Sequence, residues 1–271
     1  MGEQGQSRAG DNSCKEMSSP GTASTVSRRT LAEFIGTALL VAAVIGSGIA
    51  AARLSPRDTG LQLLENAAAT AGALTAVILA VGPVSGAHLN PVVTLADWRL
   101  GGISGADGLA YAVAQIGGGV AGAVAANVMF ALPPIEISST ARWGAHLWFS
   151  EVVATFGLLL VIFGGVRSGR AALVPIGVGA YIGGAYWFTS STSFANPAVT
   201  IARTFSNTFA GIAPSSVGPF LAAQVAGTLL AIAAVRVLYP TIAEVAATVV
   251  LPHTQPAGHS GSGGRADRSA R

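Results

Sequence analysis

Two short segments of the chain place an Asn-Pro pair at the start of an apolar run. Asn90 and Pro91 lie in the segment 86–94, and Asn196 and Pro197 lie in the segment 193–200. Asn is a favoured helix N-cap because its side-chain oxygen accepts a backbone N–H, and Pro is tolerated at the first helical position. An Asn that caps through its oxygen keeps its amide hydrogens as donors. One such pair would be an ordinary capped helix, but two pairs in matching places indicate a shared polar site.

The composition predicts a membrane protein. Hydrophobic residues make up 51% of the chain and charged residues only 10%, whereas soluble domains carry about 25% charged residues. A helix needs roughly 20 apolar residues to cross a bilayer, and we expect six such spans in an all-α fold. A strand-based pore would show alternating segments of about ten residues, and none appear. The spans are expected at 31–51, 67–84, 108–132, 147–166, 171–188 and 220–235.

The two ends of the chain differ from this apolar region. We expect a disordered tail over 1–29, a channel domain over 30–240, and a short amphipathic stretch followed by a disordered tail over 241–271. The single cysteine, Cys14, excludes an intramolecular disulfide. The net charge of +3 reflects basic flanks and does not indicate a nucleic-acid surface. No enzyme signature appears, and neither a metal nor a cofactor is expected.

The two halves of the apolar region, 31–132 and 146–239, repeat one another. Each half opens a span with Glu, carries one Asn-Pro segment and closes with a span that contains Ala-Gln. These residues are Glu33 and Gln115 in the first half, and Glu151 and Gln224 in the second. Three spans are an odd number, so the second half enters the membrane from the opposite face and the repeats are inverted.

Inverted repeats fix the place of the Asn-Pro segments. The run 91–99 would form a helix of roughly 14 Å, which is about half of a ~30 Å hydrocarbon core. One half-helix therefore enters from each side, and the two N-termini meet near the midplane. Irregular backbone at that depth requires burial in protein or a water-filled path. We therefore expect the extended stretches before the half-helices to line a pore, through Gly86, Ala87, His88, Thr192 and Phe194.

The chain resembles the aquaporin/major intrinsic protein family over about 31–239. The resemblance rests on the boxes Asn90-Pro91-Val92 and Asn196-Pro197-Ala198, the segment Ser-Gly-Ala-His-Leu-Asn-Pro before the first box, and the repeated Glu and Ala-Gln positions. It implies a homotetramer in the lipid bilayer with one pore per subunit, which passes water or small uncharged solutes. The distribution of Lys and Arg favours both termini on the cytoplasmic side, in what we expect to be a bacterial inner membrane.

Three buried polar residues have two interpretations each. Glu33 and Glu151, the only intramembrane acids expected, would act either as a proton relay or, as the resemblance implies, as acceptors for the backbone N–H groups of the pore loops. The structural role is favoured because buried charge requires partners. His88 either lines or gates the pore, or only packs its loop.

The expected selectivity filter departs from the family pattern. Val92 replaces the usual Ala of the first box, and Val199 stands where most family members have an Arg. Carrying the other filter positions over without gaps gives Thr70, Gly184 and Ser193. These residues predict a wide filter without charge or aromatic wall. Arg203 lies one turn further along the half-helix and is expected to face the outer vestibule or a partner loop, with a position inside the pore as the alternative.

The sequence therefore predicts a passive channel for neutral solutes such as glycerol, urea or undissociated metalloid acids, in addition to water. The filter with Val199 resembles that of bacterial aquaglyceroporins associated with arsenic resistance, which suggests arsenous acid. A water-selective aquaporin is the first alternative. An inverted-repeat secondary transporter is the second, and it would need a coupling site that faces a cavity.

Overall fold

The computed structural model describes residues 25–240, and this part of the chain is helical without any strand. Residues 1–24 and 241–271 lie outside the described residues, and with them lie most of the predicted N-terminal tail and all of the predicted C-terminal stretch and tail. Helix α1 begins at Val26 after the N-cap Thr25, so residues 26–29 belong to a helix and not to the predicted N-terminal tail. The helices are α1 (Val26–Leu54), α2 (Thr59–Ser85), α3 (Pro91–Leu100), α4 (Gly105–Met129), α5 (Ala145–Arg167), α6 (Val174–Phe188), α7 (Pro197–Ala202) and α8 (Pro214–Leu238), with 3-10 turns η1 (Ala171–Leu173) before α6 and η2 (Arg203–Phe205) after α7.

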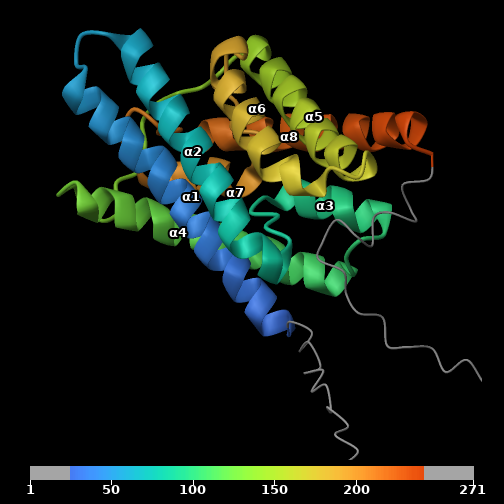
Figure 1. The fold of residues 1–271 in the computed structure, drawn as a ribbon. Coiled ribbons are helices and arrows are strands. Elements are labelled where there is room, and N and C mark those ends of the chain that lie inside the picture. Colours follow the sequence, from blue (N-terminus) through green and yellow to red (C-terminus); the bar gives the residue numbers. More distant parts are fainter. Residues whose placement is uncertain (1–24, 241–271) are drawn as a thin grey trace, which may run out of the picture.

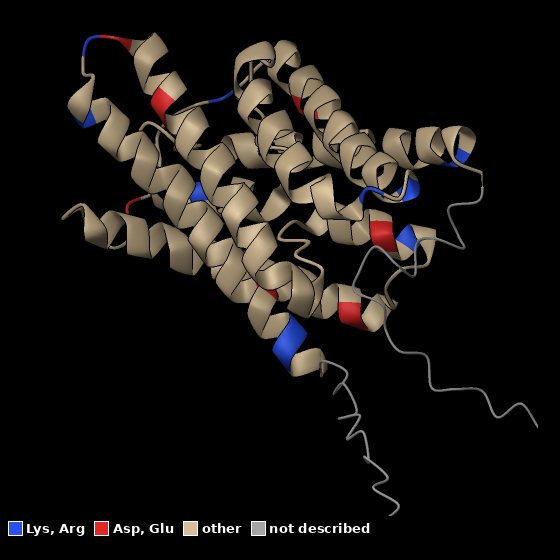
Figure 2. Cartoon of the chain, viewed as in Figure 1, with Lys and Arg blue, Asp and Glu red and all other residues tan. Residues whose placement is uncertain are grey.

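Six of these helical segments are long and apolar enough to cross a membrane: α1, α2, α4, α5, the segment 171–188, and α8. This agrees with the six predicted spans. Charged residues lie mostly at helix ends and in loops (Figure 2). Large apolar side chains such as Leu39, Leu109 and Phe149 are exposed on the long helices, as expected where lipid is the solvent.

The six long helices form two groups of three (Figure 1). In the first repeat α1 packs against α2 and α4, and in the second α5 packs against α6 and α8. The two groups meet where α2 contacts α6. Equivalent helices thus make equivalent contacts, as the predicted repeat requires.

The closest helix pairs are held together at glycines. A Cβ added at Gly122 of α4 would overlap the backbone carbonyl of Ala38 on α1, and one added at Gly118 would overlap that of Phe34. In the second repeat a Cβ at Gly227 of α8 would overlap the backbone of α5. Small residues allow this approach of backbones in membrane helices.

The two short helices, α3 and α7, lie between the repeats, and each contacts both α4 and α8. Each begins at the predicted Asn-Pro pair. The first has 10 residues and ends at Gly101, whose φ of 91° is left-handed. The second has only 6 residues before it tightens into the 3-10 turn η2.

Both ends of the described chain lie on the same side of the molecule. Arg29 in the first turn of α1 donates through Nε to Tyr111 Oη at 2.8 Å, near the start of α4. Arg236 in the last turn of α8 donates to the Arg99 carbonyl oxygen at 3.1 Å, near the end of α3. We call this the terminal side. The loops 130–144 and 206–213 lie on the opposite side, which we call the far side.

Candidate functional site

The two Asn residues of the predicted boxes meet at the centre of the molecule. Asn90 Oδ1 accepts from the Val92 N–H at 3.1 Å, and Asn196 Oδ1 accepts from the N–H groups of Ala198 and Val199 at 2.9 and 3.2 Å. Both side chains therefore cap their half-helices, as predicted.

The amide groups of the two Asn side chains also connect the repeats. Asn90 Nδ2 donates to the Ala195 carbonyl oxygen, and Asn196 Nδ2 donates to the Leu89 carbonyl oxygen, both at 2.8 Å. These bonds between the two repeats were not predicted from the sequence, which indicated only that the amide hydrogens stay available as donors. In the structure each amide uses one hydrogen across the centre and keeps the other.

The loops that precede the half-helices adopt a strained backbone. Ala87, Leu89, Ser193 and Ala195 have φ angles of 50°, 51°, 50° and 47°, and Thr192 has 62°. The left-handed region costs roughly 1–2 kcal/mol for a residue with a Cβ. The strain falls at equivalent positions, three and one residues before each Asn, so both loops need an external anchor.

Glu33 and Glu151 provide these anchors. Glu33 accepts from the backbone N–H groups of His88 and Leu89 at 2.9 and 2.6 Å. Glu151 accepts from those of Phe194 and Ala195 at 2.9 and 2.8 Å. Both carboxylates are fully buried, and neither lines the central cavity. The structure thus favours the anchoring interpretation over a proton relay.

The two Ala-Gln positions complete the same frame. Gln115 Nε2 donates to Glu33 Oε2 at 2.8 Å and to Thr94 Oγ1 at 3.1 Å. Gln224 Nε2 donates to Glu151 Oε2 at 2.7 Å and to Thr200 Oγ1 at 2.9 Å. Each Gln therefore links its carboxylate to the half-helix of the same repeat.

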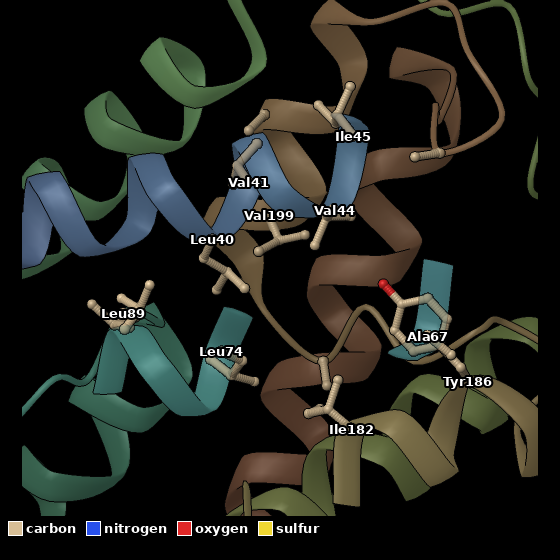
Figure 3. Packing of buried hydrophobic residues seen from close by; sticks show 14 of the residues in the cluster. Leu40, Val41, Val44, Ile45, Ala67, Leu74, Leu89, Ile182, Tyr186 and Val199 are labelled. Carbon is tan, nitrogen blue, oxygen red and sulfur yellow. The ribbon is translucent and has the colours of Figure 1, made fainter. Parts of the chain in front are cut away.

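A cavity of about 510 Å³ runs past both Asn residues, with walls that are mostly aliphatic. The predicted site residues that line it are Thr70, Gly86, Ala87, His88, Asn90, Ser193, Phe194, Asn196 and Val199. Pro91, Val92, Thr192, Pro197 and Ala198 are absent from its wall, so the prediction that Thr192 lines the pore is wrong. Figure 3 shows Val199 beside Leu40 and Val44 of α1.

The prediction for Gly184 is wrong. Gly184 lies on the exposed stripe of α6 that also carries Ile176, and a Cβ added there would meet no atom within 4 Å. The cavity is lined instead by Ile182 and Tyr186 of α6. Successive residues of an α-helix differ by about 100° in direction. Gly184 therefore points away from Ile182 and Tyr186, which lie two residues before and after it.

The far-side end of the cavity contains the aromatic and charged groups that the predicted filter lacked. Tyr186 Oη lies 3.3 Å from Thr70 Oγ1. Arg203 is 2% exposed and lines the cavity, its guanidinium lies 3.5 Å from the centre of the Phe194 ring, and its Nε donates to the Ala210 carbonyl oxygen. Arg203 therefore reaches both a far-side loop and the cavity. The prediction of a filter without charge or aromatic wall is wrong.

Ser193 adds a polar group to the same wall. Its hydroxyl oxygen is buried and has no hydrogen-bond partner within residues 25–240. Since Ser193 lines the cavity, this hydroxyl is available to a molecule that passes.

His88 lines the cavity and so does more than pack its loop, whereas a gating role stays a prediction. Its ring lines the cavity and packs edge-on against Tyr111, with ring centres 5.3 Å apart. Its Nδ1 lies 3.1 Å from Thr94 Oγ1.

Asp97 is a cavity residue that the sequence analysis missed. It lies in α3, is 1% exposed and lines the cavity, and its Oδ2 is 3.5 Å from His88 Nε2. Glu33 and Glu151 are therefore not the only acids within the membrane region. Asp97 follows Asn90 by seven residues, which is two helical turns on the same face, and this spacing could have revealed it. Arg203 occupies the equivalent position after Asn196.

Comparisons with known proteins agree with this architecture. The family model described as major intrinsic protein matches residues 21–190. The chain is 48% identical to aquaglyceroporin AqpS of Rhizobium meliloti over 78% of this chain and 90% of that protein. It is 30% identical to a probable aquaporin AqpM of Archaeoglobus fulgidus over 67% of this chain and 82% of that protein.

The fold also matches a solved structure. The aquaglyceroporin from Plasmodium falciparum superposes with a TM-score of 0.62 over 80% of this chain and 99% of that one, at 20% sequence identity. The inverted triplets, the paired capping Asn residues and these matches together show that the chain belongs to the major intrinsic protein family, the family of aquaporins and aquaglyceroporins.

Proposed function

We propose that this protein is a passive channel for water and for small uncharged solutes such as glycerol. The observation that carries the proposal is the cavity that passes both Asn side chains between walls that are mostly aliphatic. Aliphatic walls do not hold a neutral solute tightly, and a few polar groups are enough to replace part of its hydration shell.

The central Asn residues support the exclusion of ions. The two half-helices direct their N-termini at the centre, and each terminus carries about half a positive charge before screening. The amide hydrogens that the Asn side chains keep are donors there, so water must present its oxygen to them. This arrangement disfavours cations and interrupts a chain of water molecules along which protons could move.

The positions and hydrogen bonds of the buried acids favour passive conduction over coupled transport. A proton- or sodium-coupled carrier uses carboxylates that face its cavity. Glu33 and Glu151 accept backbone N–H groups and lie outside the cavity wall. Asp97 is the single acid on that wall among the described residues, so the paired carboxylates that such carriers usually place in their cavity are missing from residues 25–240.

A solute larger than water is favoured by Val199. This residue lines the cavity and has neither charge nor hydrogen-bond donor at the position where the family usually has Arg. The relative from Rhizobium meliloti carries the name aquaglyceroporin. Arsenous acid, a neutral molecule with three hydroxyl groups, is the finer proposal and rests on the resemblance of the filter.

A water-selective channel is the second candidate, and it rests on Tyr186 and Arg203. Both residues reach the cavity from positions that the sequence comparison did not assign to the filter. If they narrow the far-side end as a filter aromatic and a filter arginine would, glycerol would be excluded.

The proposed setting is a bacterial inner membrane with a homotetramer and both termini in the cytoplasm. The two ends of the described chain lie on one side of the molecule, which supports placing both termini on the same side of the membrane. The terminal side would then be the inner mouth of the pore, and the far side the outer mouth.

Stopped-flow light scattering on proteoliposomes tests the function. Vesicles with the purified protein should shrink faster than empty vesicles in an impermeant osmolyte, and should then reswell in glycerol or arsenous acid. Reswelling at the rate of empty vesicles, together with fast shrinkage, would establish the water-selective alternative. A flux that requires a proton or sodium gradient would establish a transporter.

A further inference from the structure

A buried carboxylate on the terminal side of the pore has no hydrogen-bond donor among residues 25–240. Asp97 lines the cavity and is 1% exposed, and within residues 25–240 neither of its carboxylate oxygens accepts a hydrogen bond. A buried carboxylate is costly unless donors surround it. The cavity that it lines is the place from which donors can come.

His88 places a second acceptor beside this carboxylate. The single hydroxyl proton of Thr94 goes to the Asn90 carbonyl oxygen at 3.2 Å. The contact of 3.1 Å between Thr94 Oγ1 and His88 Nδ1 then needs the ring proton on Nδ1. His88 Nε2 is left with a lone pair 3.5 Å from Asp97 Oδ2, and Nε2 is also without a partner in the described part of the chain.

Arg29, whose charge acts on both His88 and Asp97, makes its direct contacts with other groups. Arg29 donates through Nε to Tyr111 Oη at 2.8 Å, and its Nη1 lies 3.6 Å from the Asp107 carboxylate. The Asp97 carboxylate packs directly against Gly102, where an added Cβ would overlap its Oδ1. The equivalent residue of the other repeat, Arg203, differs in that it donates to Ala210 and lies over Phe194.

We propose that Asp97 and His88 form a binding site for a neutral solute that carries several O–H donors, a polyol or an undissociated hydroxo acid. One hydroxyl donates to the Asp97 carboxylate and a second donates to His88 Nε2. A solute with two or three hydroxyls satisfies both acceptors at once, which a single water molecule does less well. This inference rests on the proposed function, and it makes Asp97 a residue that determines specificity.

The concentration dependence of glycerol uptake tests the site. Uptake of labelled glycerol into proteoliposomes should saturate, because a site that binds the solute fills. Asp97→Asn keeps the shape but weakens the acceptor, and should raise the half-saturating glycerol concentration about tenfold, the loss expected for one hydrogen bond to a charged group. The ratio of glycerol flux to water flux should fall with it.

Two glycine variants separate the position of the carboxylate from general damage. Gly102→Ala leaves Asp97 in the chain but displaces its carboxylate, and should change the half-saturating concentration in the same direction as Asp97→Asn. Gly72→Ala on the exposed face of α2, where an added Cβ meets no atom within 4 Å, should behave as the unaltered protein.

If Asp97→Asn does not fold, infrared spectra of the unaltered protein with isotope-labelled aspartate replace it. Glycerol should shift one carboxylate band in that protein and not in Gly102→Ala. Uptake that rises linearly with glycerol, an unchanged half-saturating concentration in Asp97→Asn, or an equal loss of water and glycerol flux would each overturn the site. Absence of any glycerol or arsenous-acid flux in the unaltered protein would instead refute the proposed function.

Discussion

Replacement of Glu33 or Glu151 by Gln tests how the pore loops are held, since it turns one carboxylate oxygen into an NH2 group. Each oxygen of Glu33 accepts two hydrogen bonds. Oε1 accepts from Ser85 Oγ at 2.6 Å and from the His88 N–H at 2.9 Å. Oε2 accepts from the Leu89 N–H at 2.6 Å and from Gln115 Nε2 at 2.8 Å. Either orientation of Gln at this position therefore deprives two donors of their acceptor.

The second repeat offers the matched control, because the bonds of Glu151 are divided unevenly. Within residues 25–240, Oε1 accepts from the Phe194 N–H alone, and Oε2 accepts from the Ala195 N–H and Gln224 Nε2. Gln at 151 can turn its NH2 toward Phe194 and lose a single bond. Since a buried donor without a partner costs about 1–3 kcal/mol, we expect a loss of about 2–6 kcal/mol for Glu33→Gln and about 1–3 kcal/mol for Glu151→Gln.

Thermal unfolding in detergent, followed by size-exclusion chromatography of the heated samples, measures the order of stability. We expect the unaltered protein to be the most stable, followed by Glu151→Gln and then Glu33→Gln, with Glu33→Ala the least stable because four donors lose their acceptor. Folded Glu151→Gln should still conduct. Equal stability of Glu33→Gln and the unaltered protein, or a greater loss for Glu151→Gln, would refute the anchoring argument. Loss of flux in well-folded Glu151→Gln, with a proton gradient required for flux in the unaltered protein, would support the transporter.

Three further predictions concern the filter, the centre and the helix packing. Val199→Arg should narrow the cavity and add a fixed charge, and a barrier higher by about 1.4 kcal/mol would slow glycerol or arsenous acid about tenfold. Proteoliposome assays should show a smaller loss of water flux. Unchanged solute flux in folded protein would show that Val199 does not belong to the filter. Asn196→Asp keeps an acceptor for the half-helix but cannot donate to the opposite loop. We therefore expect lower thermal stability and a cation current in planar bilayers. A bilayer with this variant that carries no cation current would contradict the role of the Asn196 amide in excluding cations. Gly122→Ala should destabilise the protein by about 1–3 kcal/mol because the new Cβ overlaps the carbonyl of Ala38. The control for thermal unfolding is Gly218→Ala, where a Cβ meets no atom within 4 Å. Equal melting temperatures of the two variants would refute the close-packing argument.

The features that the sequence predicted correctly are those that appear twice. Each half of the chain contains three apolar runs, one Asn-Pro pair and one Glu at the start of a span. Each of these features can therefore be matched to its equivalent in the other half. Inversion then places Asn90 and Asn196 at the centre without knowledge of any helix angle. The anchoring role of Glu33 was implied by the resemblance to the family, and it agrees with the need of a loop buried in the membrane for acceptors of its N–H groups.

The features that the sequence did not predict depend on the direction of single side chains. Gly184 was carried over by counting back from Asn196, but the direction of a helical residue changes by about 100° per position. The fold directs Tyr186 and Ile182 inward instead. Arg203 was predicted on the half-helix, but it follows α7 and begins the 3-10 turn η2. It lines the cavity and donates to the loop at Ala210, which no local pattern reveals. Asp97 was passed over, although Arg203 at the equivalent position of the second repeat was considered.

The crossed bonds of the two Asn side chains limit how this channel can move. Each bond joins the half-helix of one repeat to the loop of the other, at 2.8 Å in both directions. The two repeats cannot separate at the midplane unless both bonds break together, and the backbone beside each bond is held by a buried carboxylate. The middle of the pore is thus a fixed hinge point about which the remaining parts can tilt. We therefore expect any opening or closing of the pathway at its two mouths, on the far side around Tyr186 and Arg203 and on the terminal side around Asp97.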